Sequence, residues 1–229
     1  SKVGPIIELH PWLALPSGQA LLDWEQAQVD RLVADVFGYH ALQLGMPELD
    51  ALRNNRMPHQ WLASADLDAA LDNKPLNFAA HSVALPFQAD SLDLVVMPHT
   101  LELSLDAHIC LREAQRVLVP EGHLVIAGLN PTSLWGWRHK RSQWYQKWGY
   151  KGLSAPPLEE MIGYWRLRDW LRLLGFEVQV SRFGGWTPAL GSERWMQRLS
   201  WMDTVGQRWC PILGGVYLLM ATKRVPGGR

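Results

Sequence analysis

Short apolar segments alternate with segments of helical periodicity along most of the chain, and this alternation constrains the fold more than any other feature. Continuous apolar strands separated by helices indicate a parallel sheet that is covered on both faces. The expected strands lie at residues 40–45, 60–65, 76–80, 92–97, 123–128, 177–182 and 215–223. We therefore predict an α/β fold, Rossmann-like, with a seven-stranded, mostly parallel sheet and helices on both faces.

Helix signals fall before and between these strands. A leading helix is predicted over residues 17–37, where Ser17 can cap the start and Gly38 can end the last turn. Pro47 suits the first turn of a helix after the first strand, and Asp106 opens a later helix. Further helices are expected at 66–71, 164–175 and 192–209.

The length of the chain suits one large domain and is too short for two ordinary domains with a long linker. The 229 residues contain no internal repeat, low-complexity tract or linker that would divide them. We predict a single domain over 1–229, with the leading helix at 17–37 and insertions at 131–152 and 183–214.

The first insertion, 131–152, is rich in lysine, arginine and tryptophan and contains no acidic residue. We expect a solvated helix whose tryptophans pack on the domain, or else a lid over a pocket. Contact with nucleic acid or a membrane surface through 131–152 is a less favoured reading. Lys and Arg total 22 against 22 for Asp and Glu, so no global charge attracts such partners.

The two cysteines, Cys110 and Cys210, have no spacing that would hold zinc or form a redox pair. A reducing, cytoplasmic setting is expected, because the first residues lack a secretory pattern and no stretch is apolar enough to span a membrane. No metal site is expected.

Four segments resemble the methyltransferase type 11 family, which has the class I S-adenosylmethionine-dependent methyltransferase fold. They are ALPFQADSLDLVVMPHTLEL, LREAQRVLVPEGHLVIAG, RLRDWLRLLGFEV and GVYLLMATK, and they occur in the order of the family. The resemblance implies that S-adenosylmethionine is the cofactor and S-adenosylhomocysteine the product.

A ligand of an open parallel sheet binds beyond the carboxyl ends of the strands, where the strand order reverses. This rule places the loop after Leu44 beside the loop after Met97. The resemblance then implies a cofactor site formed by Gln43, Gly45, Asp66, His81, Ser82, Met97 and Pro98. Asp66 is equally well explained as a helix cap.

The chain departs from the family pattern in its first loop. Gln43 stands where the family has an acid, Gly45 is the one glycine of that loop, and His81 stands where an acid follows the third strand. An amide cannot offer an ionised carboxylate to the cofactor's ammonium group. An alternative function is therefore a catalytically degenerate methyltransferase fold that acts as a binding or regulatory scaffold.

His99, after the fourth strand, is the candidate catalytic residue, as a general base or as a group that orients the substrate. A histidine that only orders the turn is an equally good reading, and Glu102 and Asp93 are expected to support the fold. Trp135, Trp137 and Tyr145 are candidate substrate contacts, and SLWGW at 133–137 can form an apolar wall. We expect methyl transfer to a small, apolar acceptor.

Overall fold

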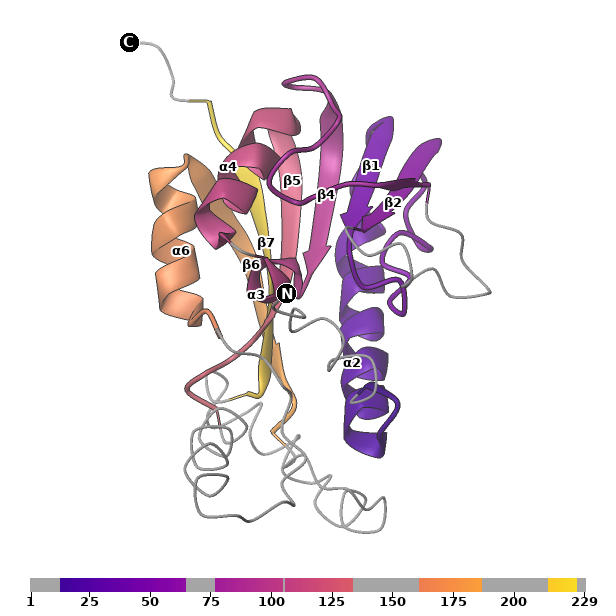
Figure 1. Ribbon diagram of the computed structural model, residues 1–229, viewed down its shortest axis with the longest axis vertical. Helices are drawn as coiled ribbons and strands as arrows, with labels where there is room; N and C mark the ends of the chain where they lie inside the picture. Colours follow the sequence, from indigo (N-terminus) through magenta and orange to yellow (C-terminus); the bar gives the residue numbers. More distant parts are fainter. Residues whose placement is uncertain (1–12, 65–76, 105, 134–160, 187–213, 226–229) are drawn as a thin grey trace, which may run out of the picture.

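The computed structural model describes residues 13–64, 77–104, 106–133, 161–186 and 214–225 (Figure 1). These residues contain one seven-stranded sheet with the order β3-β2-β1-β4-β5-β7-β6. The strands are β1 His40–Leu44, β2 His59–Ser64, β3 Phe78–Ala79, β4 Leu92–Pro98, β5 Leu118–Leu129, β6 Phe176–Gly184 and β7 Val216–Lys223. The predicted number and sequence order of the strands are confirmed.

The sheet is parallel from β3 to β5, and β7 runs antiparallel to both β5 and β6. The strand order reverses between β1 and β4, which are paired with Gln43 opposite Val96. The predicted Rossmann-like, mostly parallel sheet is therefore confirmed, and its switch point lies between β1 and β4.

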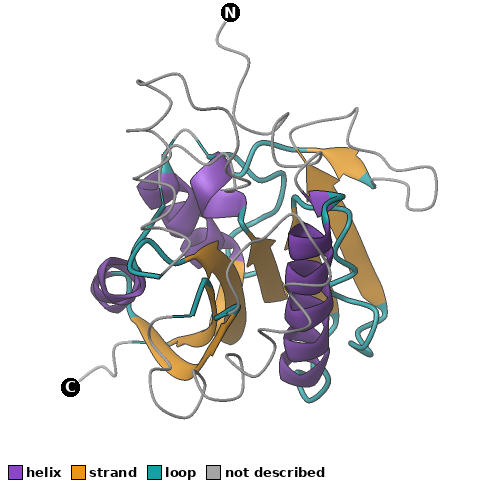
Figure 2. Cartoon of the chain, turned by 90° about the horizontal axis from the view of Figure 1, so that it is seen from below, coloured by secondary structure: helices purple, strands orange, loops and turns teal. Residues whose placement is uncertain are grey.

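Helices cover both faces of the sheet (Figure 2). The helices are α2 Pro16–Val33, α3 Thr100–Leu103, α4 Ala107–Val117 and α6 Tyr164–Leu173. Apolar residues of α2 pack with Val96 and Val125 in one cluster, whereas those of α4 and α6 pack with Met97 and Ile126 in another. Alternate residues of each central strand thus enter opposite cores, as their period of two requires. No described helix is long and apolar enough to cross a membrane.

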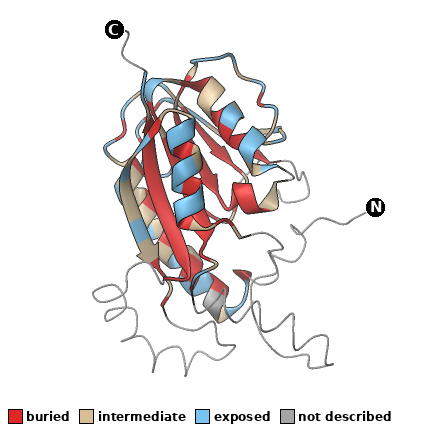
Figure 3. Ribbon diagram, turned by 90° about the vertical axis from the view of Figure 1, so that its left-hand side faces the viewer, coloured by how far each residue is buried: buried red, intermediate tan, exposed pale blue. Residues whose placement is uncertain are grey.

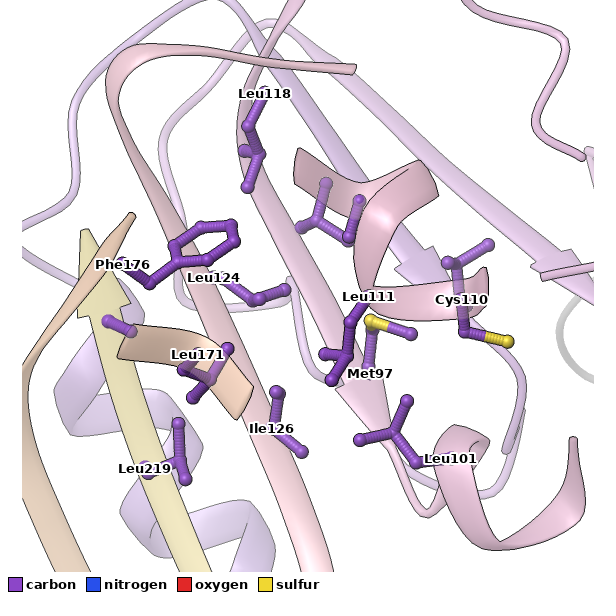
Figure 4. Close-up of a cluster of buried hydrophobic side chains, with 14 of the residues drawn as sticks. Met97, Leu101, Cys110, Leu111, Leu118, Leu124, Ile126, Leu171, Phe176 and Leu219 are labelled. Carbon is purple, nitrogen blue, oxygen red and sulfur yellow. The ribbon is translucent and has the colours of Figure 1, made fainter. Parts of the chain in front are cut away.

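The core under α4 and α6 is built mostly from aliphatic side chains of these helices and of the strands, with the ring of Phe176 from β6 among them (Figure 4). Strands β1, β4 and β7 are almost wholly buried, while the helices expose one side (Figure 3). Burial of the apolar strand residues therefore holds the strands in place, and this positions the loops that follow their carboxyl ends.

Local signals set several of the element ends. Asp106 caps α4 as predicted, because its carboxylate accepts hydrogen bonds from the backbone N–H of His108 and Ile109 at 2.9 and 3.1 Å. Asp93 is structural as predicted, since its Oδ2 accepts the N–H groups of Tyr39 and His40 at 2.8 and 2.9 Å.

The helix predicted from Pro47 is wrong. Residues 46–55 form turns instead, closed by hydrogen bonds such as Leu49 N–H to the Met46 carbonyl at 3.1 Å. Gly45 and Met46 both have positive φ, at 74° and 47°, which sends the chain away from a right-handed helix. The leading helix is also shorter than predicted and ends at Val33, where Asn55 donates to the Val33 carbonyl at 2.8 Å.

Several predicted features lie outside the described residues. These are the helices at 66–71 and 192–209, Asp66, Trp135, Trp137 and Tyr145, and almost all of both insertions.

Candidate functional site

The loops after β1 and β4 meet at the carboxyl edge of the sheet. Thr100 Oγ1, two residues beyond β4, donates to the carbonyl of Leu44 at 2.6 Å. Gly45 N–H donates in turn to the Ala63 carbonyl of β2 at 2.7 Å. The two loops that were expected to be neighbours are thus bonded directly at the switch point, where a ligand of this fold class binds.

The side chain of Gln43 holds the loop after β1 through hydrogen bonds to its backbone. The side chain is buried, and Nε2 donates to the carbonyls of Gly45, Met46 and Leu49 at 3.2, 3.0 and 2.7 Å. Its Oε1 accepts the N–H of Ala51 at 3.0 Å. A glutamate could not donate to these carbonyls, so the amide at position 43 suits the loop. Gln43 shapes the backbone of the loop, and direct contact with the cofactor stays a prediction.

Among the described residues, Gly45 has room for a side chain or a ligand beside its backbone. A Cβ atom built on Gly45 would meet one described atom within 4 Å, Thr100 Oγ1 at 3.6 Å. With φ at 74°, the position also suits glycine far better than any L-residue with a side chain. Room beside a left-handed glycine is what a backbone needs in order to approach a ligand closely.

His99 is buried at the centre of a cluster that joins three elements. It lies between β4 and α3 and adopts a left-handed conformation with φ at 51°. Its Nδ1 donates to Glu102 Oε2 of α3 at 2.9 Å, and its Nε2 donates to Glu25 Oε1 of α2 at 2.8 Å. The other oxygen of Glu102 accepts the N–H of Leu129 at the end of β5. We call Glu25, His99 and Glu102 the buried acidic cluster.

The two carboxylates decide the charge of His99. Burial by itself would lower the pKa of the imidazole, but the charges of Glu25 and Glu102 and their hydrogen bonds raise it well above its usual value. With a carboxylate on each nitrogen, the ring is an imidazolium that donates twice. An imidazole held in this way is suited to the orienting role that was also predicted for His99, and its part in the reaction stays a prediction.

Glu25 is the residue that the sequence interpretation missed. It lies four residues after Leu21 and four before Val29, both of which are buried on the core side of α2. A carboxylate on the apolar face of an amphipathic helix is the signal that could have found it. Its second oxygen, Oε2, is buried and accepts no hydrogen bond from a described residue.

The other predicted site residues that the structure describes lie at the end of β4 and after β3. Met97 and Pro98 are buried at the end of β4. His81 and Ser82 follow β3, with His81 exposed and Ser82 Oγ accepting from the Cys110 thiol of α4 at 3.1 Å. Within the described ranges, no three His, Cys, Asp or Glu side chains gather in a way that could hold a metal ion.

Comparison with known proteins identifies the family. A family model for a methyltransferase domain matches residues 57–126. The Escherichia coli protein YafS, which is described as uncharacterized, is 34% identical over 173 residues, which cover 75% of this chain and 67% of YafS. The chain belongs to the methyltransferase type 11 family.

Solved structures show that this type 11 protein has the class I fold. A SAM-dependent methyltransferase of Thermotoga maritima superposes with a TM-score of 0.63 at 15% identity, covering 96% of each chain. A SAM-dependent methyltransferase of Archaeoglobus fulgidus has a TM-score of 0.59 at 18% identity, covering 88% of this chain and 94% of its own. At these identities the likeness establishes the fold and leaves the chemistry to the site.

The site of this type 11 protein fits the cofactor of its family in two respects. The open turn at Gly45 can admit a ligand against the backbone, and Glu25 Oε2 is a buried acceptor that no described donor satisfies. It differs in a third respect, because the amide of Gln43 is engaged by the loop itself.

Proposed function

We propose that this protein transfers the methyl group of S-adenosylmethionine to a small, apolar acceptor, with S-adenosylhomocysteine as the product. The observation that carries the proposal is the open, left-handed turn at Gly45, which lies at the switch point between β1 and β4. Membership of a methyltransferase family supplies the reaction class.

When bound, S-adenosylmethionine supplies a methyl group that is already activated on a sulfonium centre. The protein therefore has to position the acceptor in line with that methyl group and exclude water. The backbone at Gly45 would receive the cofactor, and the groups expected to line the rest of its site are Asp66, His81, Ser82, Met97 and Pro98. His99, held by Glu25 and Glu102, fixes the start of α3 and so orients the groups that follow β4.

The apolar character of the acceptor rests on the sequence. Trp135, Trp137 and Tyr145 belong to an insertion that follows β5, and loops after parallel strands stand beside the ligand in this fold class. Their side chains are suited to an acceptor with an aromatic or aliphatic body. Contact of 131–152 with nucleic acid or membranes would require binding that falls steeply with added salt.

A binding scaffold without catalysis is the second candidate function. Its support is Gln43. The end of β1 carries this amide in place of a carboxylate, and all four hydrogen bonds of the side chain are made with backbone groups of the loop. A scaffold of this kind need not bind S-adenosylmethionine.

Calorimetric titration with S-adenosylmethionine and S-adenosylhomocysteine separates the two functions. The wild type is expected to bind both, and Gly45→Val is expected to bind neither, because its side chain fills the open turn. Gly175→Val is a matched control: Gly175 has φ at 80° and its Cβ would also meet one described atom, at 3.6 Å, but it lies in the turn between α6 and β6. No binding to the wild type at millimolar concentration would favour the scaffold.

A further inference from the structure

Glu25 Oε2 is the unexplained atom of the buried acidic cluster. Glu25 is 0% exposed, and only its Oε1 is bonded, to His99. A buried carboxylate oxygen that accepts no hydrogen bond is costly, so native proteins rarely keep one without a purpose. Among the described residues no donor satisfies it, which indicates that the donor comes with a ligand.

The charge of the cluster indicates what kind of ligand this is. Two carboxylates surround one imidazolium, which leaves one negative charge in excess. The phenol of Tyr217 donates to the Ile162 carbonyl at 2.9 Å, and burial and the charge of Glu102 raise its pKa, so the phenol stays neutral. No described lysine or arginine pairs with Glu25 or Glu102. A group that balances this charge is a cation.

The position of Glu25 connects the cluster with the proposed cofactor loop. Its neighbour Gln26 bonds Asp50 in both directions, donating to the Asp50 carbonyl at 2.9 Å and accepting the Asp50 N–H at 2.9 Å. Met46 and Leu49 of the same loop pack in one cluster with Leu21 and Val29 of α2. The stretch of α2 that carries Glu25 is therefore fixed against the loop that Gly45 begins.

We propose that Glu25 binds the cationic part of the cofactor through Oε2, and so provides from α2 the carboxylate that Gln43 cannot provide from β1. The inference rests on the proposed function, because it assumes that S-adenosylmethionine binds at the ends of β1 and β4. The cation has two sources in that molecule, the sulfonium and the ammonium of its methionine part. Glu25 recognises at least one of them. The ammonium would donate a hydrogen bond to Oε2, whereas the sulfonium would be attracted by charge at close approach.

Calorimetry with three ligands tests this inference. S-adenosylmethionine carries both cations, S-adenosylhomocysteine lacks the sulfonium, and the deaminated analogue of S-adenosylmethionine lacks the ammonium. Glu25→Gln is expected to weaken binding of S-adenosylmethionine at least tenfold. The analogue that lacks the recognised cation should lose much less affinity, which a merely structural effect of the substitution would not produce. Selective retention by S-adenosylhomocysteine identifies the sulfonium, and selective retention by the deaminated analogue identifies the ammonium.

Glu113→Gln is the matched control, because Glu113 is a partly buried carboxylate of α4 that pairs with Arg116 and lies outside the cluster. It should leave all three affinities unchanged. Equal affinities of Glu25→Gln and the wild type for every ligand would overturn the inference and leave the proposed function standing. Absence of binding to the wild type would overturn the proposed function itself.

Circular dichroism and thermal unfolding show whether Glu25→Gln is folded. If Glu25→Gln does not fold, the affinities of the wild type for the same three ligands are compared instead. At least one of the two analogues must then bind tenfold or more weakly than S-adenosylmethionine, and equal affinity for all three would overturn the inference.

Discussion

Gln43 shows how a single side chain can determine the shape of a binding loop. The sequence interpretation placed it against the cofactor, because it stands at the strand end where the family has an acid. In the structure its amide forms hydrogen bonds with backbone groups from Gly45 to Ala51. An amide and a carboxylate have nearly the same shape, but only the amide can donate. This difference accounts for the departure from the family pattern.

Removing that amide should destabilise the protein. Gln43→Leu leaves buried carbonyl groups and the Ala51 N–H without partners, so we expect the free energy of unfolding to fall by about 3 kcal/mol in urea denaturation. Gln60→Leu is the control, because Gln60 is exposed and its hydrogen bonds to Asn55 and Met57 can be replaced by water. A loss at position 43 no larger than that at position 60 would contradict the role assigned to Gln43.

At the scale of elements, His99 links α2 to α3 at the end of β4. Glu25 and His99 are 74 residues apart in the sequence, so no local pattern could reveal their contact. Local patterns did predict the cap of α4 at Asp106 and most of the strands, because burial and capping act over a few residues. They failed from Gly45 onward, where the left-handed residues Gly45 and Met46 and the hydrogen bonds of Gln43 replace the helix that Pro47 suggested.

The link between α2 and α3 should make stability depend on pH in a defined direction. The folded protein raises the pKa of His99 above its unfolded value of about 6.5, so the stabilisation is complete below that pH. It is lost as the pH rises through the raised pKa. The difference in unfolding free energy between the wild type and His99→Gln should therefore shrink with rising pH above about 6.5, as measured by urea denaturation.

His123 provides a control of opposite sign. Burial lowers the pKa of His123, so His123 is neutral in both the folded and the unfolded protein above neutral pH. The difference between the wild type and His123→Gln should stay constant above pH 7 or so. A difference for His99→Gln that is equally constant there would show that the imidazole is not held as a cation by Glu25 and Glu102.

At the scale of the whole molecule, the topology brings together what the sequence separates. The reversal of strand order places the loops after β1 and β4 side by side, and α2 closes over the same point from the opposite face to α4 and α6. The sequence was sufficient to predict this sheet and the neighbouring loops after β1 and β4, because these features follow from periodicity and family resemblance. It was not sufficient to predict that α2 contributes Glu25.

The central claim is that a methyltransferase cofactor binds at the carboxyl ends of β1 and β4. A crystal structure of the protein grown with saturating S-adenosylhomocysteine tests it most directly. The account predicts that the ligand lies across these two strand ends, in van der Waals contact with the backbone of Gly45. Ligand density at any other place, or a protein that crystallises at millimolar ligand with this edge empty, would contradict it.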